Sequence, residues 1–279
     1  MPANTPAPGS RPRNQVTASA QIIAEPGPGG TTRLPLLRSQ VPLVLRRTPE
    51  AVYLVSAAAG PLGGDCLNLR IEVRAGATLC LRTVAASVAL PGLDGGESLL
   101  SVTATVAEGG RLEYLPEPVV VADGARHTTD IRVSVAEGGS LVLRDELLLG
   151  RHGERGGAYR GSLRADYAGR PLLRQALDIS GTDPVTGGPA ILSGHRAVGT
   201  LLQVDPALHG DSALHGDSAL HADLGARTAA PPGAAPPGAA PPGTDPWVTV
   251  MPLATGPATL VTALAHDAVT LRKSLVITR

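Results

Sequence analysis

Val106-Ala107-Glu108-Gly109-Gly110-Arg111-Leu112 is matched by Val135-Ala136-Glu137-Gly138-Gly139-Ser140-Leu141, and more loosely by Val73-Arg74-Ala75-Gly76-Ala77-Thr78-Leu79. In each copy a strand-like run ends, a glycine-containing turn follows, and a second strand begins. Glycine supplies the positive φ that such tight connections require. Units of this kind predict stacked antiparallel sheets or a β-solenoid-like layer, although the hairpins of any β protein give the same local pattern. Either interpretation makes the chain mainly β.

The residues around these turns alternate between apolar and polar side chains. The runs 67–73, 102–106 and 131–135 place Leu, Ile, Val or Ala at every second position. A period of two is typical of a strand with one buried face. We therefore predict antiparallel multi-stranded sheets, layered or solenoid-like. Their core must consist of Leu, Val, Ile and Ala, since the chain contains no Phe.

The C-terminal part, from Trp247 onward, returns to ordered patterns. Residues 247–253 and 259–265 each predict a strand. Asp267 can then cap a short C-terminal helix, because its carboxylate can accept hydrogen bonds from the first free N–H groups. Arg272 and Lys273 lie near the helix end, where the helix dipole favours cations.

Residues 206–243 differ from the rest of the chain. A repeated Ala-Leu-His-Gly-Asp-Ser unit sets His209, His215 and His221 six residues apart, and a Pro-Pro-Gly-Ala-Ala repeat follows. Because few large apolar side chains are present to offset the entropy of ordering, we predict a disordered low-complexity insert. The histidine spacing matches no compact ligand motif, so metal binding there is the less favoured interpretation. A disordered N-terminus at 1–14 and one domain of 15–205 plus 244–279 complete the predicted organisation.

The overall charge excludes some classes of partner. The chain has 24 basic and 24 acidic residues and no basic block, so it lacks the electrostatic footprint of a nucleic-acid-binding protein. No apolar run approaches the ~18 residues of a membrane span, and the N-terminus is not a secretory signal. Cys66 and Cys80 do not make a disulfide framework. We therefore expect a cytoplasmic protein.

Two short blocks place acidic residues beside turns. In Gly63-Gly64-Asp65, the carboxylate is expected to accept backbone N–H bonds in a turn, although a polar functional site is the alternative. In 112–118, Pro116 and Pro118 cannot donate ladder hydrogen bonds, so the strand must stop, bulge or run along an edge there. Glu117 then lies at an interrupted strand, which suits edge protection, partner docking or a hydrated channel wall.

A third block, residues 145–154, combines Asp145, Glu146 and Glu154 with Arg151 and His152. Carboxylates and a histidine that approach one another can transiently hold a divalent cation. A structural arginine–carboxylate pair is the favoured alternative. The nearby glycines lack the Gly-Lys-Ser/Thr of a phosphate-binding loop, so any nucleotide chemistry must come from a partner.

An enzyme remains one alternative. A metal-dependent hydrolase would use His152, Glu154 and His195. A serine hydrolase is not indicated, because Ser193 has no Gly-x-Ser-x-Gly around it. The other alternative is a β-rich protein-interaction module.

Together, in this order and at these separations, the three acidic blocks resemble the UreD (UreH) family of urease accessory proteins. The segments 161–172 and 198–201 also match the family pattern. The resemblance covers about residues 51–202, with a weaker tail at 247–275.

This resemblance implies a non-enzymatic, mostly β scaffold without a tightly bound cofactor. Such a scaffold binds apo-urease and recruits the helical partner UreF and the GTPase UreG, so that nickel passes to the buried urease active site. Single carboxylates suit an ion in transit, because dense His or Cys clusters would hold it. The resemblance implies partner docking at Tyr114 and Arg151, and transient nickel contacts at Asp65, Glu117, Asp145, Glu146 and Glu154.

Overall fold

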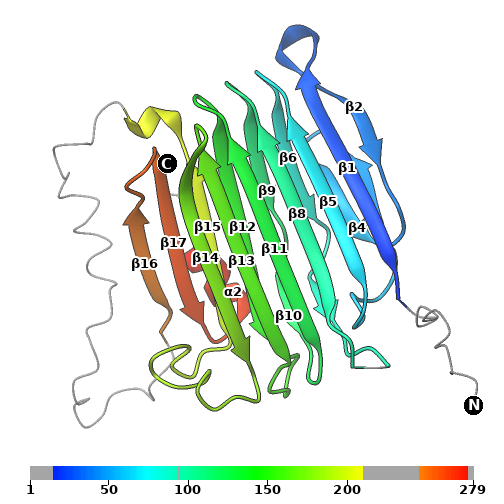
Figure 1. The fold of residues 1–279 in the computed structure, drawn as a ribbon, viewed down its shortest axis with the longest axis vertical. Helices are drawn as coiled ribbons and strands as arrows, with labels where there is room; N and C mark the ends of the chain where they lie inside the picture. The colour runs from blue at the N-terminus through cyan, green and yellow to red at the C-terminus, as the bar shows by residue number, and fades with distance from the viewer. Residues whose placement is uncertain (1–14, 94, 210–244, 276–279) are drawn as a thin grey trace, which may run out of the picture.

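Two β-sheets packed face to face make up the structure, a computed structural model that describes residues 15–93, 95–209 and 245–275 (Figure 1). Sheet A contains, in spatial order, β14 (Arg170–Ser180), β13 (Ala158–Tyr167), β11 (Arg126–Val135), β8 (Ser98–Val106), β5 (Cys66–Val73), β1 (Thr17–Pro26) and β2 (Thr32–Arg38). Sheet B contains β16 (Trp247–Pro252), β17 (Ala258–Ala265), β15 (Ala197–Val204), β12 (Ser140–Leu149), β9 (Arg111–Leu115), β6 (Thr78–Thr83), β4 (Val52–Ser56) and β3 (Leu43–Arg47). The short strands β7 (Ser87–Ala89) and β10 (Val119–Val121) extend sheet B beside β12. Two 3-10 turns, η1 (Pro28–Gly30) and η2 (Pro206–His209), and the helix α2 (Ala268–Ser274) complete the elements.

The middle of the molecule is a β-solenoid, because the chain alternates between the two sheets. From β5 it crosses to β6, returns to β8, crosses to β9, returns to β11 and crosses to β12. Strands that follow one another within a sheet therefore run parallel, as β5, β8, β11 and β13 do. The predicted mainly β, solenoid-like fold is confirmed. Among the described strands, the predicted antiparallel pairing is found toward the ends of the two sheets, for example between β13 and β14, β1 and β2, or β15 and β17, and between β12 and β15.

The repeated heptads are the turns that carry the chain from sheet A to sheet B, and they stack on one another. Ala107 N donates to Val73 O at 2.9 Å, and Ala136 N donates to Val106 O at 2.8 Å. Gly76, Gly109 and Gly138 occupy the same turn position with φ of 71°, 64° and 75°. Only glycine adopts this backbone conformation without strain, which explains why it recurs in each copy. The repetition is therefore structural, and these turns are not those of ordinary hairpins.

The inward side chains of both sheets form the main core. It consists largely of Leu, Val, Ile and Ala, with Tyr114 as a buried aromatic residue at 3% exposure. Leu67, Leu69, Ile71 and Val73 all face inward, as their alternation predicts. Proline breaks sheet B as expected, since β9 ends at Leu115 and β10 begins at Val119.

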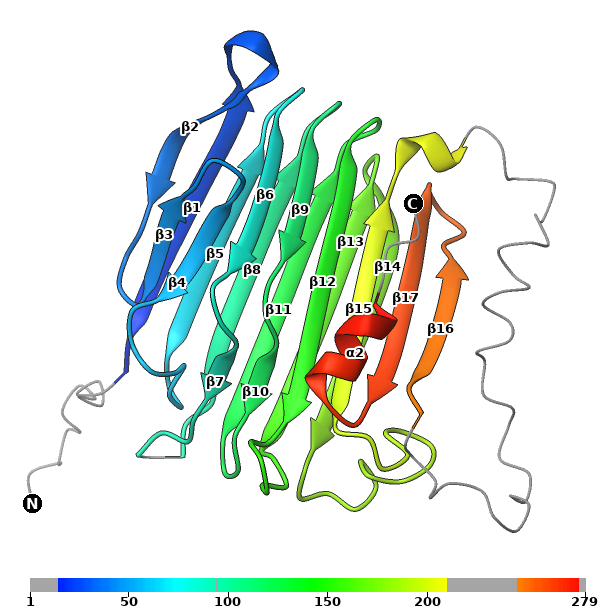
Figure 2. The same cartoon turned by 180° about the vertical axis from the view of Figure 1, so that it is seen from behind.

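Helix α2 lies on the outer face of sheet B, across β15 and β17 (Figure 2). Asp267 caps it, because its Oδ1 accepts hydrogen bonds from Val269 N at 2.8 Å and Thr270 N at 2.9 Å. Leu271 and Leu275 pack against the sheet, where Gly199 leaves room for both side chains. The predicted C-terminal helix and its cap are therefore confirmed.

Strand β17, which follows the long repeat segment, pairs with β15, which precedes it, and β16 pairs with β17 at the edge of the sheet. The predicted disordered N-terminus and most of the predicted insert, with His215 and His221, lie outside the described residues. Residues 206–209 form η2, and the structure does not describe the His209 side chain. In the described part of the chain, no helix has the length and apolar character needed to cross a membrane.

Candidate functional site

A network of two arginines and two glutamates joins α2 to the outer face of sheet B. The Arg272 guanidinium donates to Glu146 Oε1 at 2.9 Å and Oε2 at 2.5 Å, and to Glu117 Oε1 at 2.8 Å. Arg144 lies beside both carboxylates, at 3.4 Å from Glu146 and 3.9 Å from Glu117. We call these four residues the Arg272 network. The Arg272 network is part of the packed structure, because the Glu146 side chain is 0% exposed.

Local sequence explains how the Arg272 network forms. Because Pro116 and Pro118 interrupt the chain between β9 and β10, Glu117 lies outside the hydrogen-bonded strands of sheet B. Strand β12 is not interrupted, and it places Arg144 and Glu146 two residues apart on its outer face. The hydrogen bonds that Arg272 donates to Glu146, followed by those that it donates to Glu117, raise the pKa of Arg272 above its ordinary value. Burial is the main cause that lowers the pKa of Arg144, whose buried Nε makes no hydrogen bond within the described residues.

Asp145 lies between Arg144 and Glu146 in sequence but faces the opposite way, into the space between the sheets. There it lines a partly open cavity of about 280 Å³ together with Tyr159, Gln175 and Thr200. Gln175 Nε2 donates to Thr200 Oγ1 at 3.4 Å and so links β14 with β15 across this space. Burial, followed by the charge of Glu146, raises the pKa of Asp145 to about 6. Burial also raises the pKa of Tyr159, so its phenol keeps its proton.

Sequence reasoning missed a second polar group inside the solenoid, centred on His127. Its Nδ1 lies 2.8 Å from Ser98 Oγ and its Nε2 lies 3.2 Å from Thr129 Oγ1. The side chain is 1% exposed, and burial lowers its pKa to about 4. The inward parity of Ile131 and Val133, extended backwards along the strand, would have identified both His127 and Thr129.

Asp145→Asn is expected to remove a pH-dependent part of the stability. Because the folded-state pKa of Asp145 is about 6 and its ordinary value is 3.8, the stability linked to its protonated form is full below about pH 4. That stability is lost as the pH rises through 6, and it amounts to roughly 3 kcal/mol. The free-energy difference between wild type and variant, from urea unfolding between pH 4 and 7, should fall across this window.

His127 acts in the opposite sense but does not obscure this measurement. Its depressed pKa gives stability that is present above pH 6.5 and is lost as the pH falls toward 4. Wild type and variant both carry His127, so its contribution cancels in the difference. A pH-independent difference would contradict the assigned environment of Asp145.

Asp65 has a structural role in a turn, as its local chemistry predicts. Its Oδ1 accepts a hydrogen bond from Val16 N and its Oδ2 accepts one from Leu62 N, both at 2.9 Å. The residue is 5% exposed.

Glu154 and Arg151 form the favoured arginine–carboxylate pair, with Arg151 Nε 2.8 Å from Glu154 Oε1. Glu154 also accepts from Arg151 N at 2.9 Å, which closes the turn after β12. These contacts, with the side-chain bond of Arg151 the largest, lower the pKa of Glu154 to about 2.

The five predicted nickel residues therefore lie in four places. Glu117 and Glu146 come together through Arg272, Asp145 faces the cavity, and Asp65 and Glu154 occupy separate turns. Within the ranges that the structure describes, no three His, Cys, Asp or Glu side chains are placed to share a metal ion. Cys66 and Cys80 are free thiols on β5 and β6, in different sheets.

The predicted docking role of Tyr114 needs correction, because the structure buries its side chain in the core between the sheets. The alternation along β9 turns Leu112 and Tyr114 inward, which the sequence pattern alone could have indicated. Arg151 remains exposed.

The residues of the hydrolase alternative have other contacts. His152 is exposed in the turn after β12. His195 is buried, with its ring nitrogens 2.9 Å from Leu192 O and 3.1 Å from Asp245 O, and it stacks on His266.

Comparisons with known proteins agree with the sequence blocks. A family model described as UreD urease accessory protein matches residues 17–276. Urease accessory protein UreD of Frankia alni is 42% identical over an alignment of 318 positions, which covers 99% of this chain and 97% of the relative. UreD 3 of Streptomyces griseus is 43% identical over 93% of this chain and 94% of its own length, and UreD 2 of Saccharopolyspora erythraea is 38% identical over 93% and 86%. The chain belongs to the UreD family of urease accessory proteins.

Proposed function

We propose that this urease accessory protein is a non-catalytic scaffold that docks on apo-urease and helps nickel to reach the buried active site. In this proposal it acts in the cytoplasm, where it recruits UreF and the GTPase UreG, and nickel is cargo in transit. Family membership supports the role in assembly of the urease metallocentre. The observation that carries the nickel step is the single carboxylate of Asp145 on the wall of a partly open, mainly apolar pocket between the sheets.

The chemistry of that cavity suits brief contact with a cation. Apart from Asp145, its polar lining consists of neutral oxygen donors, namely Tyr159, Ser162, Gln175, Thr200, Thr249 and Thr262. Oxygen ligands of this kind hold a borderline ion such as nickel less firmly than imidazole or thiolate does. The raised pKa of Asp145 gives protons a way to compete with the cation near neutral pH. An ion that enters such a site is therefore able to leave it again.

The other four predicted nickel residues have weaker claims in this proposal. Glu117 and Glu146 are already paired with Arg272 and Arg144, and Glu154 is paired with Arg151. Asp65 uses both carboxylate oxygens for backbone N–H groups. We therefore assign the transit contact to Asp145 first, and we assign the other four to the shape of the scaffold.

Deleting the protein from a urease-producing cell tests the function as a whole. Urease purified from such cells should be made in normal amounts but carry little nickel, as measured by metal analysis of the purified enzyme. Normal nickel loading in the absence of this chain would refute the proposed role.

Asp145→Ala tests the nickel step and is expected to lower the nickel content of urease several-fold. The expected reason is the loss of the charged oxygen ligand on the cavity wall. Asp178→Ala is the matched control, because that carboxylate is 70% exposed on β14 and pairs with Arg160. Equal nickel loading with both variants, at equal protein levels, would exclude Asp145 from the path.

A further inference from the structure

Five arginines from five strands form one row across the exposed face of sheet A. The strand register places Arg38 beside Gln21, Gln21 beside Arg70, and Arg70 beside Thr103. It continues from Thr103 to Arg132, from Arg132 to Arg164, and from Arg164 to Arg174. We call the residues Arg38, Arg70, Arg132, Arg164 and Arg174 the arginine row.

Repulsion between like charges in the arginine row destabilises the folded chain when no ligand is bound. All five side chains are exposed, and Arg132, Arg164 and Arg174 lie directly opposite one another on neighbouring strands, whose backbones are about 5 Å apart. Arg132 pairs with Asp130 at 2.8 Å, and Arg174 pairs with Asp166. Among the residues that the structure describes, Arg38, Arg70 and Arg164 form no ion pair. Three cations on one flat face therefore remain available to a ligand.

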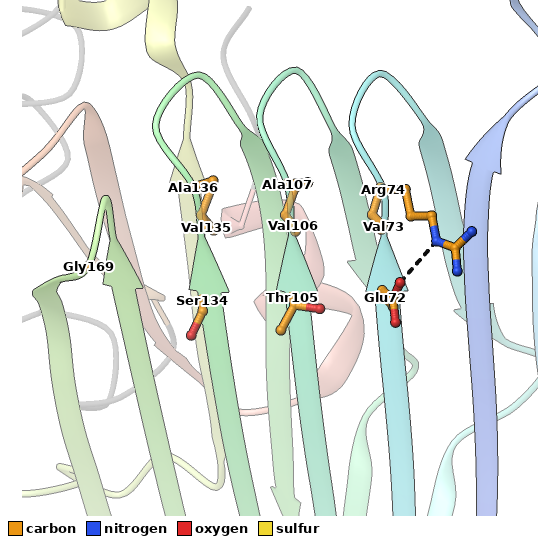
Figure 3. Close-up of a pocket in the computed structure, with 10 residues that line it drawn as sticks. All are labelled: Glu72, Val73, Arg74, Thr105, Val106, Ala107, Ser134, Val135, Ala136 and Gly169. Atoms are coloured by element: carbon orange, nitrogen blue, oxygen red, sulfur yellow. Dashed lines mark hydrogen bonds and ion pairs between the residues drawn. The ribbon is translucent and has the colours of Figure 1, made fainter.

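A groove of about 420 Å³ runs beside the arginine row, where the sheet A strands end (Figure 3). Thr105 and Ser134 lie on the same face as the row, two residues beyond Thr103 and Arg132. The far side of the groove is lined by the turn residues Ala107 and Ala136 and by the nearby Gly169, whose small size leaves that side shallow. Small side chains thus border the long arginines, so a rod-like segment fits across the strands.

Charge and spacing favour an acidic helix as that segment. On a helix, side chains three and four residues apart lie roughly 5–6 Å from one another, close to the strand separation of about 4.8 Å. A helix laid across sheet A can therefore offer one carboxylate to each of several arginines, and arginine binds carboxylates through paired hydrogen bonds. Glu72, at one end of the groove, is already held by Arg74 at 3.1 Å.

We propose that the arginine row and its groove bind the acidic face of a helix from a protein partner in urease assembly. The partner's place in urease assembly rests on the proposed function, whereas the helix-binding surface does not. A nucleic acid duplex is a poorer fit, because the row is one residue wide, is flanked by Asp130 and Asp166, and belongs to a chain of zero net charge.

Binding of a designed peptide tests this surface directly. The probe is a fluorescent helical peptide with glutamates on one face, compared with the same peptide carrying glutamines. At about 10 mM salt, where the Debye length is ~30 Å, the full chain should bind the glutamate peptide preferentially. Arg70→Glu/Arg164→Glu should weaken this binding about tenfold or more. Arg46→Glu/Arg47→Glu, with the same charge change on exposed residues of β3 in sheet B, should leave it nearly unchanged.

Three results of the peptide experiment would overturn the proposal. These are equal binding of the two peptides by wild type, equal losses in the two double variants at matched melting temperatures, or displacement of the peptide by a DNA duplex at lower concentrations than by unlabelled peptide. Co-purification with apo-urease then distinguishes a failure of the docking inference from a failure of the proposed function. If wild type and the Arg70→Glu/Arg164→Glu variant co-purify equally, the docking inference fails and the proposed function stands. If wild type itself does not co-purify, the proposed function fails, and with it the partner's place in urease assembly.

Discussion

Replacing Arg272 by methionine is expected to lower the free energy of unfolding by about 3 kcal/mol. The substitution leaves Glu146, whose side chain is 0% exposed, with only Arg144 at 3.4 Å. Breaking a buried ion pair by removing one partner typically costs about 3–5 kcal/mol, since the remaining charge stays buried. We expect the lower end of this range because Arg272 is itself 32% exposed and partly screened by water.

Urea unfolding monitored by circular dichroism measures this effect. Lys273→Met is the matched control, because Lys273 is the next residue on α2, is exposed and forms no ion pair within the described residues. Adding Glu146→Gln to Arg272→Met should recover part of the loss, since the uncompensated charge is then removed. A loss no larger than the ~1 kcal/mol of a surface ion pair would show that the Arg272 network does not hold α2 on sheet B.

Gly63→Ala is expected to destabilise the chain by roughly 2–4 kcal/mol, because the added methyl group meets backbone atoms that cannot rotate away. A Cβ at this position would lie 2.3 Å from Gly96 O and 2.6 Å from Gly92 N. Gly63 N also donates to Leu90 O at 3.0 Å, and Gly64 N donates to Glu97 O at 3.1 Å. The two chain segments can make these bonds only while both backbones stay in direct contact. The Gly63-Gly64-Asp65 block thus serves as a corner of the solenoid.

Gly187→Ala provides the comparison for this prediction. Gly187 is exposed, and the nearest atom to a Cβ there is Pro184 O at 3.9 Å. The free energy of unfolding of the Gly187→Ala variant should therefore differ little from that of the wild type. Urea unfolding gives the stability of both variants. Faster hydrogen exchange at the amides of Gly63 and Gly64 would locate the damage at this corner. Equal stability of the two variants would contradict the close backbone approach.

The local pattern of the chain was sufficient for its elements. Alternation predicted the strands, Asp267 predicted the start of α2, and the prolines predicted the break between β9 and β10. These features depend on side chains within a few residues of one another, which the sequence displays directly.

Strand direction could not be obtained in the same way. A glycine turn between strands of one sheet and a glycine turn between two sheets have the same local sequence signal. Only the stacking of Ala107 N on Val73 O and of Ala136 N on Val106 O distinguishes a solenoid from a series of hairpins. This explains why the central strands are parallel where antiparallel pairing was predicted.

For the candidate site, the acidic blocks and the family that they resemble could be recognised from the sequence by itself, whereas the roles of individual carboxylates could not. Asp145 and Glu146 are neighbours in the chain, yet one faces the cavity and the other meets Arg272, which lies 126 residues away. The arginine row likewise joins residues that are far apart in sequence through strand register. Periodicity within a strand is a local property that the sequence records, whereas register and long-range ion pairs exist only after the sheets have packed.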